Sequence, residues 1–343
     1  MNIDLPNWPY CYGAPFATGN FRKQPEDFIV TEQLSFQPSG DGEHAFLQIQ
    51  KTGENTEFVA RQLARFADVR QRDIGYAGLK DRHAVATQWF SVWLPGKADP
   101  DWAQFATDNI RVLQIHRHAR KLKRGVLSGN HFKITVREWQ GDPEQTAQTE
   151  RQLATIKSHG IANYYGPQRF GHAGQNVSKA LAMFQGQKTG REQRSLYLSA
   201  VRSYLFNHIL ARRVQDGTWQ QALSGDTYFF DGSQSCFKSE QPDAEILRRL
   251  AENIIHPSGV LWGKGVQDVT ADALALEQAV LARYPELAEG LEQAGIAKAR
   301  RALRVSVADL QWTFLDGPAL ALSFTLPAGC YATALLREIV KSQ

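Results

Sequence analysis

The sequence predicts an α+β protein in which a sheet-forming domain is interrupted by a mainly helical insertion. Strand-like composition occurs at 28–32 and 132–137, and again near the end of the chain at 310–315 and 320–326. Helical periodicity prevails instead from about residue 160 to residue 303. Because the strand pattern resumes after the helical region, we expect the first domain to be discontinuous and to be closed by the C-terminal strands.

The first domain contains signals for a helix and for a loop between two extended segments. Thr56 is an acceptable N-cap, and apolar residues follow it at helical spacing, namely Val59, Leu63 and Phe66. Asp81 falls between the segment 71–76 and a predicted strand at 87–94. Loops at the ends of such elements commonly carry catalytic groups.

Helical stripes in the middle and at the end of the chain indicate the domain organisation. One stripe is traced by Leu198, Val201, Leu205, Ile209 and Arg212. A second, after Tyr331, contains Leu335, Leu336, Ile339 and Val340. We therefore expect one domain of residues 1–160 and 306–343, and a second domain inserted at residues 161–305.

The composition is that of an ordinary folded protein, with 343 residues, 43% hydrophobic and 22% charged. No segment approaches the roughly 18 apolar residues of a membrane span, and the first residues do not resemble a signal peptide, so we expect a cytoplasmic protein without membrane contact. Cys11, Cys236 and Cys330 are far apart in the sequence, which predicts neither a zinc site nor a disulfide framework. We expect no metal, no cofactor and a monomer.

A basic run lies between residues 109 and 137, where the sequence has no acidic residue. Its eight cations are Arg111, Arg117, Arg120, Lys121, Lys123, Arg124, Lys133 and Arg137. The run includes Asn130 and Phe132, and cations beside amides and aromatic rings are the mixture that holds RNA phosphates and unstacked bases. A solvated charged face is the alternative interpretation.

Asp81 is the candidate catalytic group because it lies between Lys80 and Arg82. Flanking cations favour the ionised form of a carboxylate, and an ionised carboxylate in a binding groove can act as a nucleophile or a base. An isolated Lys-Asp-Arg triplet on the surface is the simpler alternative. Under the catalytic interpretation we expect Lys80 and Arg82 to draw phosphate towards the site.

Seven motifs in the same order and at compatible spacings make the chain resemble the tRNA pseudouridine synthase D (TruD) family. They are PEDFIVTE at 25–32, GEH at 42–44, KTGENT at 51–56, AGLKDRH at 77–83, GNHF at 129–132, NYYGPQRFG at 163–171 and LPAGCYA at 326–332. The resemblance covers nearly the whole chain. It implies a pseudouridine synthase catalytic domain with a mixed, mainly antiparallel sheet, and an inserted α-rich (α/β) domain specific to the family.

The resemblance implies that the protein isomerises a uridine of tRNA, uridine 13, to pseudouridine. It places the nucleophile on Asp81, a charge partner on Arg22 with Lys23 as the other candidate, and substrate contacts on Phe28, Asn130, Phe132 and Tyr331. A carboxylate can add to uracil C6, attack C1′ or remove the 2′ proton to give a glycal, and these routes stay open.

Three alternatives to these assignments follow from the residues alone. Phe132 shares a predicted strand face with Ile134 and Val136, so on pattern alone it belongs to the core. A non-catalytic RNA-binding module would use the same basic and aromatic residues without requiring Asp81. A tRNA methyltransferase would need a glycine-rich cofactor loop, and none is visible in the sequence.

Overall fold

The computed structural model describes residues 3–342, which fall into two compact units. The sheet unit comprises residues 16–147, 307–329 and 340–342, and the helical unit comprises residues 3–15, 148–306 and 330–339. Asp81 belongs to the sheet unit. The expected domains, 1–160 with 306–343 and 161–305, stay a prediction.

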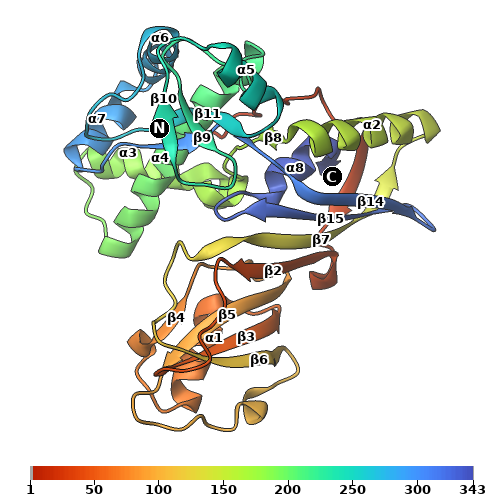
Figure 1. Cartoon of the computed structure of the whole chain (residues 1–343), viewed down its shortest axis with the longest axis vertical. Helices are drawn as coiled ribbons and strands as arrows, with labels where there is room; N and C mark the ends of the chain where they lie inside the picture. Colours follow the sequence, from red (N-terminus) through yellow and green to blue (C-terminus); the bar gives the residue numbers. More distant parts are fainter. Residues whose placement is uncertain (1–2, 343) are drawn as a thin grey trace. The chain divides into compact units, whose positions relative to one another are not determined.

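The sheet unit is built on a mixed sheet of ten strands within the described residues (Figure 1). The main path runs in the order β14 (Ala308–Leu315), β15 (Ala319–Pro327), β7 (Leu127–Gln140), β2 (Phe28–Leu34), β5 (Val85–Trp93), β3 (His44–Thr52) and β6 (Ile110–His118). Three short strands are added, namely β1 (Ala17–Phe21), β4 (Ile74–Tyr76) and β16 (Val340–Ser342). Among the described pairings, β2 with β5 and β1 with β16 are parallel and the others are antiparallel. The expected α+β fold with a mainly antiparallel sheet is confirmed.

The long strand β7 connects the parts of this sheet, because it pairs with β1, β2 and β15. Its partner β15 shows the predicted alternation, with Leu320, Leu322, Phe324 and Leu326 all buried. Side chains of directly opposed residues lie on the same face of a sheet. The register therefore places Phe132 on one face together with Val30 of β2 and Phe324 of β15.

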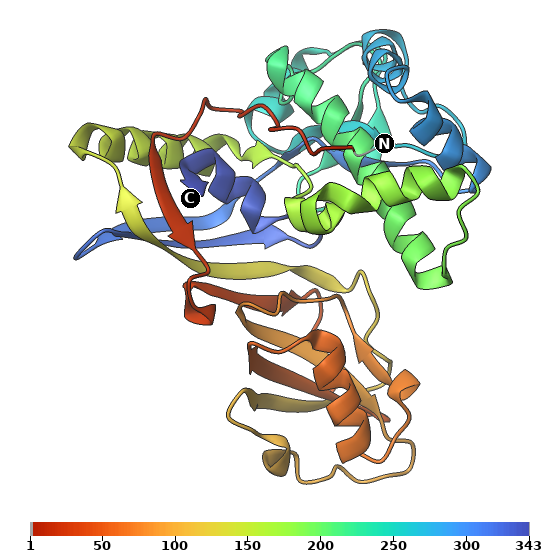
Figure 2. The ribbon, with the colours of Figure 1, turned by 180° about the vertical axis from the view of Figure 1, so that it is seen from behind.

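Helix α1 (Thr56–Phe66) lies against the other half of the sheet (Figure 2). Its buried residues Val59 and Leu63 pack in one core cluster with Leu47 and Ile49 of β3. The helix begins at Thr56, and Asn55 rather than Thr56 is the N-cap residue. This correction matters because the Thr56 side chain is left free to bond elsewhere.

The helical unit combines helices with two small sheets. Its helices are α2 (Pro143–His159, within the unit from residue 148), α3 (Gln175–Phe184), α4 (Arg191–Gln215), α5 (Ala244–Ala251), α6 (Ala271–Leu281), α7 (Pro285–Gln293) and α8 (Ala332–Ile339). One sheet has the order β10 (Cys236–Lys238), β9 (Thr227–Phe230), β11 (Ile255–Leu261) and β12 (Ala299–Ala302), and β13 (Arg304–Val305) pairs with β8 (Ile161–Ala162). The sequence predicted the helical character but not these individual strands.

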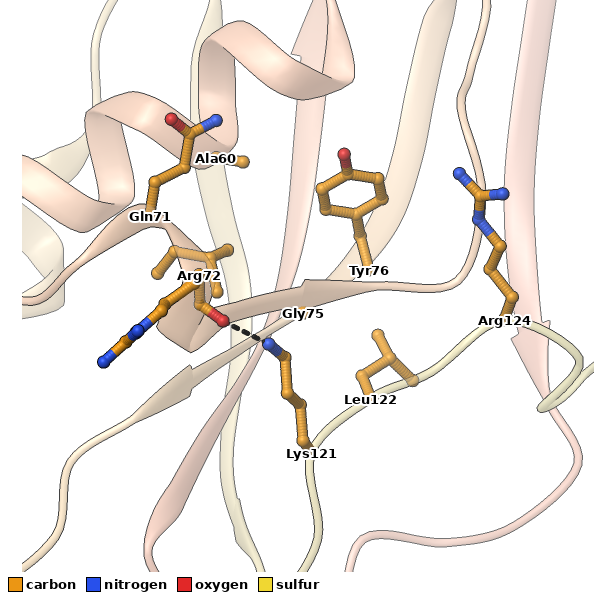
Figure 3. Close-up of a pocket in the computed structure, with 9 residues that line it drawn as sticks. Ala60, Gln71, Arg72, Gly75, Tyr76, Lys121, Leu122 and Arg124 are labelled. Carbon is orange, nitrogen blue, oxygen red and sulfur yellow. Dashed lines mark hydrogen bonds between the residues drawn. The ribbon is translucent and has the colours of Figure 1, made fainter. Parts of the chain in front are cut away.

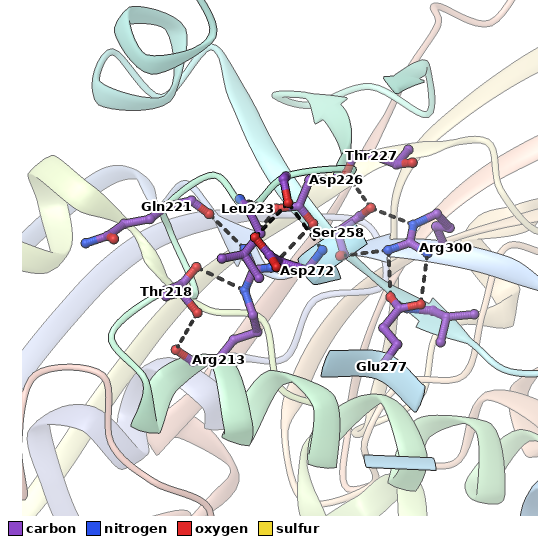
Figure 4. A network of polar contacts seen from close by, with 12 residues as sticks. Arg213, Thr218, Gln221, Leu223, Asp226, Thr227, Ser258, Asp272, Glu277 and Arg300 are labelled. Atoms are coloured by element: carbon purple, nitrogen blue, oxygen red, sulfur yellow. Dashed lines mark hydrogen bonds and ion pairs between the residues drawn. The ribbon is translucent and has the colours of Figure 1, made fainter. Parts of the chain in front are cut away.

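Buried ion pairs hold α4 and α6 against the four-stranded sheet of this unit (Figure 4). Arg213 of α4 pairs with Asp226 at 3.1 Å, and the exposed fractions of the two side chains are 2% and 1%. Arg213 also donates to the carbonyls of Thr218 and Gln221. On β12, Arg300 pairs with Glu277 of α6 at 2.8 Å. These charges are matched and hydrogen-bonded, as burial requires.

The Arg213–Asp226 pair generates a stability prediction. Arg213→Met should lower the free energy of unfolding by about 3–5 kcal/mol, because it leaves Asp226 buried without a counter-ion. Arg213→Met/Asp226→Leu should cost clearly less than the two single substitutions added together, since no charge remains buried. Urea unfolding followed by circular dichroism measures all three variants. Additive costs would contradict direct coupling of the two side chains.

Candidate active site

The Asp81 carboxylate lies in the loop between β4 and β5 and is paired with Arg22. Arg22 Nη2 is 3.0 Å from Asp81 Oδ2, and 25% of the arginine side chain and 33% of the aspartate side chain are exposed. Arg22 follows β1, and its φ of +77° is in the left-handed region, which costs a non-glycine residue about 1 kcal/mol or more. Lys23 pairs with Glu138 instead. Of the two candidate partners, Arg22 is therefore the one in contact with Asp81.

Arg22 also connects Asp81 to a row of aromatic rings. Its guanidinium carbon lies 4.3 Å from the centroid of the Phe28 ring, within the range of a cation–π interaction. Phe28 meets Phe132 edge-on at 6.0 Å, and Phe132 stacks on Phe324 at 5.3 Å. The predicted site residues Arg22, Phe28 and Phe132 thus form a continuous series that begins at the carboxylate.

The aromatic side chains are largely buried in the sheet surface. Phe28 is 5% exposed, Phe132 is 6% exposed and Phe324 is fully buried. The core location indicated by sequence pattern alone is therefore correct for Phe132. Only a small part of Phe28 and Phe132 is therefore open to a ligand.

Asn130 presents an unused acceptor on the same sheet face. Its backbone lies opposite Glu32 of β2 and Leu326 of β15, two positions along β7 from Phe132. Asn130 Oδ1 is buried and has no hydrogen-bond partner among the described residues 3–342. A buried acceptor without a hydrogen bond costs about 1–3 kcal/mol of stability. A ligand that donates a hydrogen bond to this oxygen would recover that cost.

The loop that carries Asp81 is fixed by side chains from its own surroundings. Lys51, at the end of β3, is fully buried and donates from Nζ to the carbonyls of Asp81 at 3.1 Å and Glu54 at 2.6 Å. The Thr56 hydroxyl accepts from Lys80 N at 3.0 Å and donates to Gln88 Oε1 at 2.9 Å. These bonds position the backbone on both sides of the Asp81 carboxylate.

Of the two cations that flank Asp81 in the sequence, Lys80 does not act as predicted, whereas Arg82 stays exposed. Lys80 Nζ pairs with Glu32 Oε1 at 2.7 Å, and the two side chains are 11% and 0% exposed. Glu32 in turn accepts from Trp89 N at 2.8 Å. Lys80 is thus a buried structural cation, and the expectation that it draws phosphate towards the site is wrong. Arg82 donates to the Gly53 carbonyl at 3.1 Å, which leaves its head group exposed.

Tyr331, the remaining predicted substrate contact, belongs to the helical unit and directly precedes α8. Its ring lies edge-on to Tyr165, with the centroids 5.7 Å apart. Burial raises the pKa of the Tyr331 hydroxyl. In the same unit Arg169 donates to Ser203 at 3.1 Å, so the 163–171 segment packs against α4.

The basic run follows β6, the segment 119–126 and β7, and only part of its charge is neutralised. Arg117 pairs with Asp99 at 2.9 Å and Arg137 pairs with Asp27 at 2.6 Å. The other six cations of the run have no ion pair with a carboxylate among the residues that the structure describes. A surplus of positive charge therefore persists on this part of the sheet unit.

The described residues contain neither a metal-binding cluster nor a membrane-spanning helix. Between residues 3 and 342, no three or more His, Cys, Asp or Glu side chains gather closely enough to hold a metal ion. In the same range, no helix has the length and apolar character needed to cross a membrane.

Sequence reasoning missed the residues that fix the loop. Lys51, Thr56 and Glu32 all occur in the quoted motifs, which was the available signal, but no pattern indicates that a lysine or glutamate is fully buried. Gln88 donates to the Gly78 carbonyl at 2.6 Å. It lies in a predicted strand but in none of the quoted motifs, so the sequence did not mark it as a functional residue.

Comparisons with known proteins agree with this fold. The family model described as tRNA pseudouridine synthase D (TruD) matches residues 7–187 and 172–339. A solved structure of a protein from Methanosarcina mazei, described as a candidate tRNA pseudouridine synthase D, superimposes with a TM-score of 0.71 at 22% identity, covering 99% of this chain and 96% of that one. The fold is therefore of the pseudouridine synthase D class.

Two curated relatives are both called tRNA pseudouridine synthase D. The protein of Methylococcus capsulatus is 50% identical over 97% of this chain and 94% of its own length. The protein of Nitrosococcus oceani is 48% identical over 97% of this chain and 94% of its own length. The chain belongs to the tRNA pseudouridine synthase D family.

Lys51 generates a prediction on the pH dependence of stability. Burial lowers the pKa of Lys51 from 10.5 to about 8, and the Asp81 carboxylate opposes this shift. Between these values the unfolded chain binds more protons than the folded one, so this group makes the unfolding free energy rise with pH. Relative to Lys51→Met, wild type should gain up to about 1.4 kcal/mol per pH unit from pH 8 towards 10.5.

Urea unfolding of both proteins at several pH values measures this difference. The exposed Lys97 provides a matched control, because Lys97→Met removes an ammonium group of the same unit that is not buried. A Lys51→Met curve that runs parallel to that of wild type over this range would contradict the lowered pKa of Lys51.

Proposed function

We propose that this protein converts a uridine of tRNA, uridine 13, to pseudouridine, with Asp81 as the nucleophile. The observation that supports the proposal is the Arg22–Asp81 ion pair in a chain of the tRNA pseudouridine synthase D family, in the same sheet unit as the unpartnered amide oxygen of Asn130. The curated relatives are named as tRNA pseudouridine synthases, without mention of the target uridine or of the nucleophile. The finer assignments, to uridine 13 and to Asp81, are part of the proposal.

The proposed reaction demands little of the protein. The N1 to C1′ bond breaks, the freed uracil rotates, and C5 joins to C1′, so no atom is added and no redox change occurs. The Arg22 guanidinium contacts the Asp81 carboxylate, and a carboxylate is a group that can attack C6 or C1′ or remove the 2′ proton. Arg22 also orients the carboxylate, because a charge-assisted hydrogen bond fixes one of its oxygens.

The target base must leave the RNA stack before it can react, at a cost of about a few kcal/mol. In the proposal, the small exposed parts of Phe28 and Phe132 receive the base and Asn130 Oδ1 accepts from a uracil N–H. Tyr331 stays a proposed substrate contact from the helical unit.

We also propose that the protein acts in the cytoplasm as a monomer, without metal or cofactor. Residues 161–305 are proposed to form an inserted domain.

Asp81→Asn tests the catalytic proposal directly. Forming the C5 to C1′ bond must release the hydrogen at uracil C5, so tRNA labelled there with tritium reports turnover. Asp81→Asn should abolish tritium release, because an amide cannot replace the carboxylate as nucleophile or base, while tRNA affinity changes little. No release by wild type from unmodified tRNA would instead favour a non-catalytic RNA-binding module.

Arg22 gives a second test with a graded outcome. Arg22→Met removes both the positive charge and the oriented hydrogen bond, so the single-turnover rate at saturating tRNA should fall by about ten- to a hundredfold. Arg22→Lys retains the charge and should recover part of that rate. Lys23→Met serves as the control, because Lys23 contacts Glu138. Equal rates for Arg22→Met and Lys23→Met would overturn the role proposed for Arg22.

A further inference from the structure

A second candidate ligand site lies in the sheet unit, in a hollow of about 540 Å³ (Figure 3). It is lined by Ala60, Gln71, Arg72, Ile74, Gly75, Tyr76, Lys121, Leu122 and Arg124. These residues come from α1, β4, the turn before β4 and the segment between β6 and β7. None of them is a proposed contact of the target uridine.

The hollow carries positive charge that the protein leaves unneutralised. Neither the Arg72 nor the Arg124 guanidinium has a hydrogen bond or ion pair with another described residue, and both side chains are exposed. The Lys121 ammonium donates to the Arg72 carbonyl, which adds no negative charge. Asp73, the acid closest in sequence to Arg72, is already paired with Arg70 at 3.2 Å. Arginine side chains without a partner can bind a phosphate, because the planar guanidinium group donates two parallel hydrogen bonds to phosphate oxygens.

The shape of the hollow is fixed by a close backbone approach. Leu122 N donates to Ser91 Oγ at 3.0 Å, which holds the 119–126 segment against β5 at the point where Ser91 pairs with Gly75 of β4. A Cβ at Gly75 would lie 2.5 Å from both the Leu122 carbonyl oxygen and Ser91 Oγ, so any side chain there would push the segment away. The floor of the hollow is therefore preformed.

An aromatic ring and an amide complete the lining. Figure 3 shows the Tyr76 ring standing between Arg124 on one side and Gln71 and Arg72 on the other. Tyr76 is half-buried and packs edge-on against Phe90 at 6.2 Å, which keeps the ring in place. Burial raises the pKa of the Tyr76 hydroxyl, the Glu57 carboxylate raises it further and the Arg124 guanidinium lowers it, so charges of both signs act on this ring. Cations that can hold backbone phosphates, placed near an aromatic ring that a base can stack on, are typical of proteins that bind single-stranded RNA.

We propose that this hollow binds a backbone phosphate of the RNA substrate, outside the target nucleotide, through Arg72, Lys121 and Arg124. The inference rests on the proposed function, because that function makes RNA the ligand. Tyr76 ends β4 and Asp81 follows five residues later, so their Cα atoms are at most about 18 Å apart. An RNA strand that delivers a base to Asp81 can therefore place a nearby phosphate in the hollow.

Phosphate-ethylation interference tests the proposal on wild type and Arg72→Ala/Arg124→Ala. In this experiment, ethylated phosphates that weaken binding of unmodified tRNA mark contacts. One or two positions that interfere with wild type should stop interfering with the double variant. Log affinity decreases as log salt concentration increases. This negative slope should become shallower by about 0.7–0.9 for each phosphate that the variant no longer binds.

Arg65→Ala/Lys97→Ala is the matched control, because it removes two exposed cations of the same unit that do not line the hollow. It should leave every interference position in place. An Arg72→Ala/Arg124→Ala variant with the wild-type interference pattern and the salt slope of the control would overturn the proposal. Wild-type tritium release decides the proposed activity separately, since the interference experiment measures binding alone.

Discussion

The site is organised by the ion pair between Arg22 and Asp81, which joins two segments that are far apart in the sequence. Each end of the pair is fixed by a different cause. Arg22 is placed by the pairing of β1 with β7 and by its left-handed backbone conformation. Asp81 is placed by Lys51 and Thr56, which bond to the backbone on either side of its carboxylate. The geometry therefore depends on the whole sheet unit rather than on the loop alone.

Buried charges around this loop favour one arrangement at a cost in stability. Lys51 is fully buried and Glu32 is nearly so. Removing a charged group from water is costly unless counter-ions or hydrogen bonds in the protein replace the lost hydration. Glu32 has Lys80 as its counter-ion, whereas Lys51 bonds to neutral carbonyls and no carboxylate lies within ion-pair distance of it in the described part of the chain. We infer that this cost is tolerated because directional bonds fix the loop more closely than apolar packing would.

The sequence predicted the elements whose pattern is strong and local. Strands β2, β7, β14 and β15 alternate clearly or are rich in β-branched residues, and α1 has a single apolar stripe. The short strands β4 and β16 have only three residues each, and β12 reads Ala-Arg-Arg-Ala, so neither length nor alternation indicates a strand. The motifs placed Asp81 and Arg22 among the candidates. Burial of Lys51 and the pairing of Lys80 with Glu32 depend on contacts across the sheet, which no local pattern encodes.

The contrast between Asn130 and Phe132 bears on how a uracil would be recognised. Phe132 is nearly enclosed by Phe28 and Phe324, so most of its surface is already used within the sheet. Asn130, two residues earlier, keeps a buried acceptor without a partner in the described residues. A preformed apolar edge discriminates weakly between bases of similar shape, whereas an unpaired buried acceptor penalises any ligand that lacks a donor at that point. Under the proposed function, selection of the base therefore falls mainly to Asn130, and the aromatic residues chiefly offset the cost of unstacking.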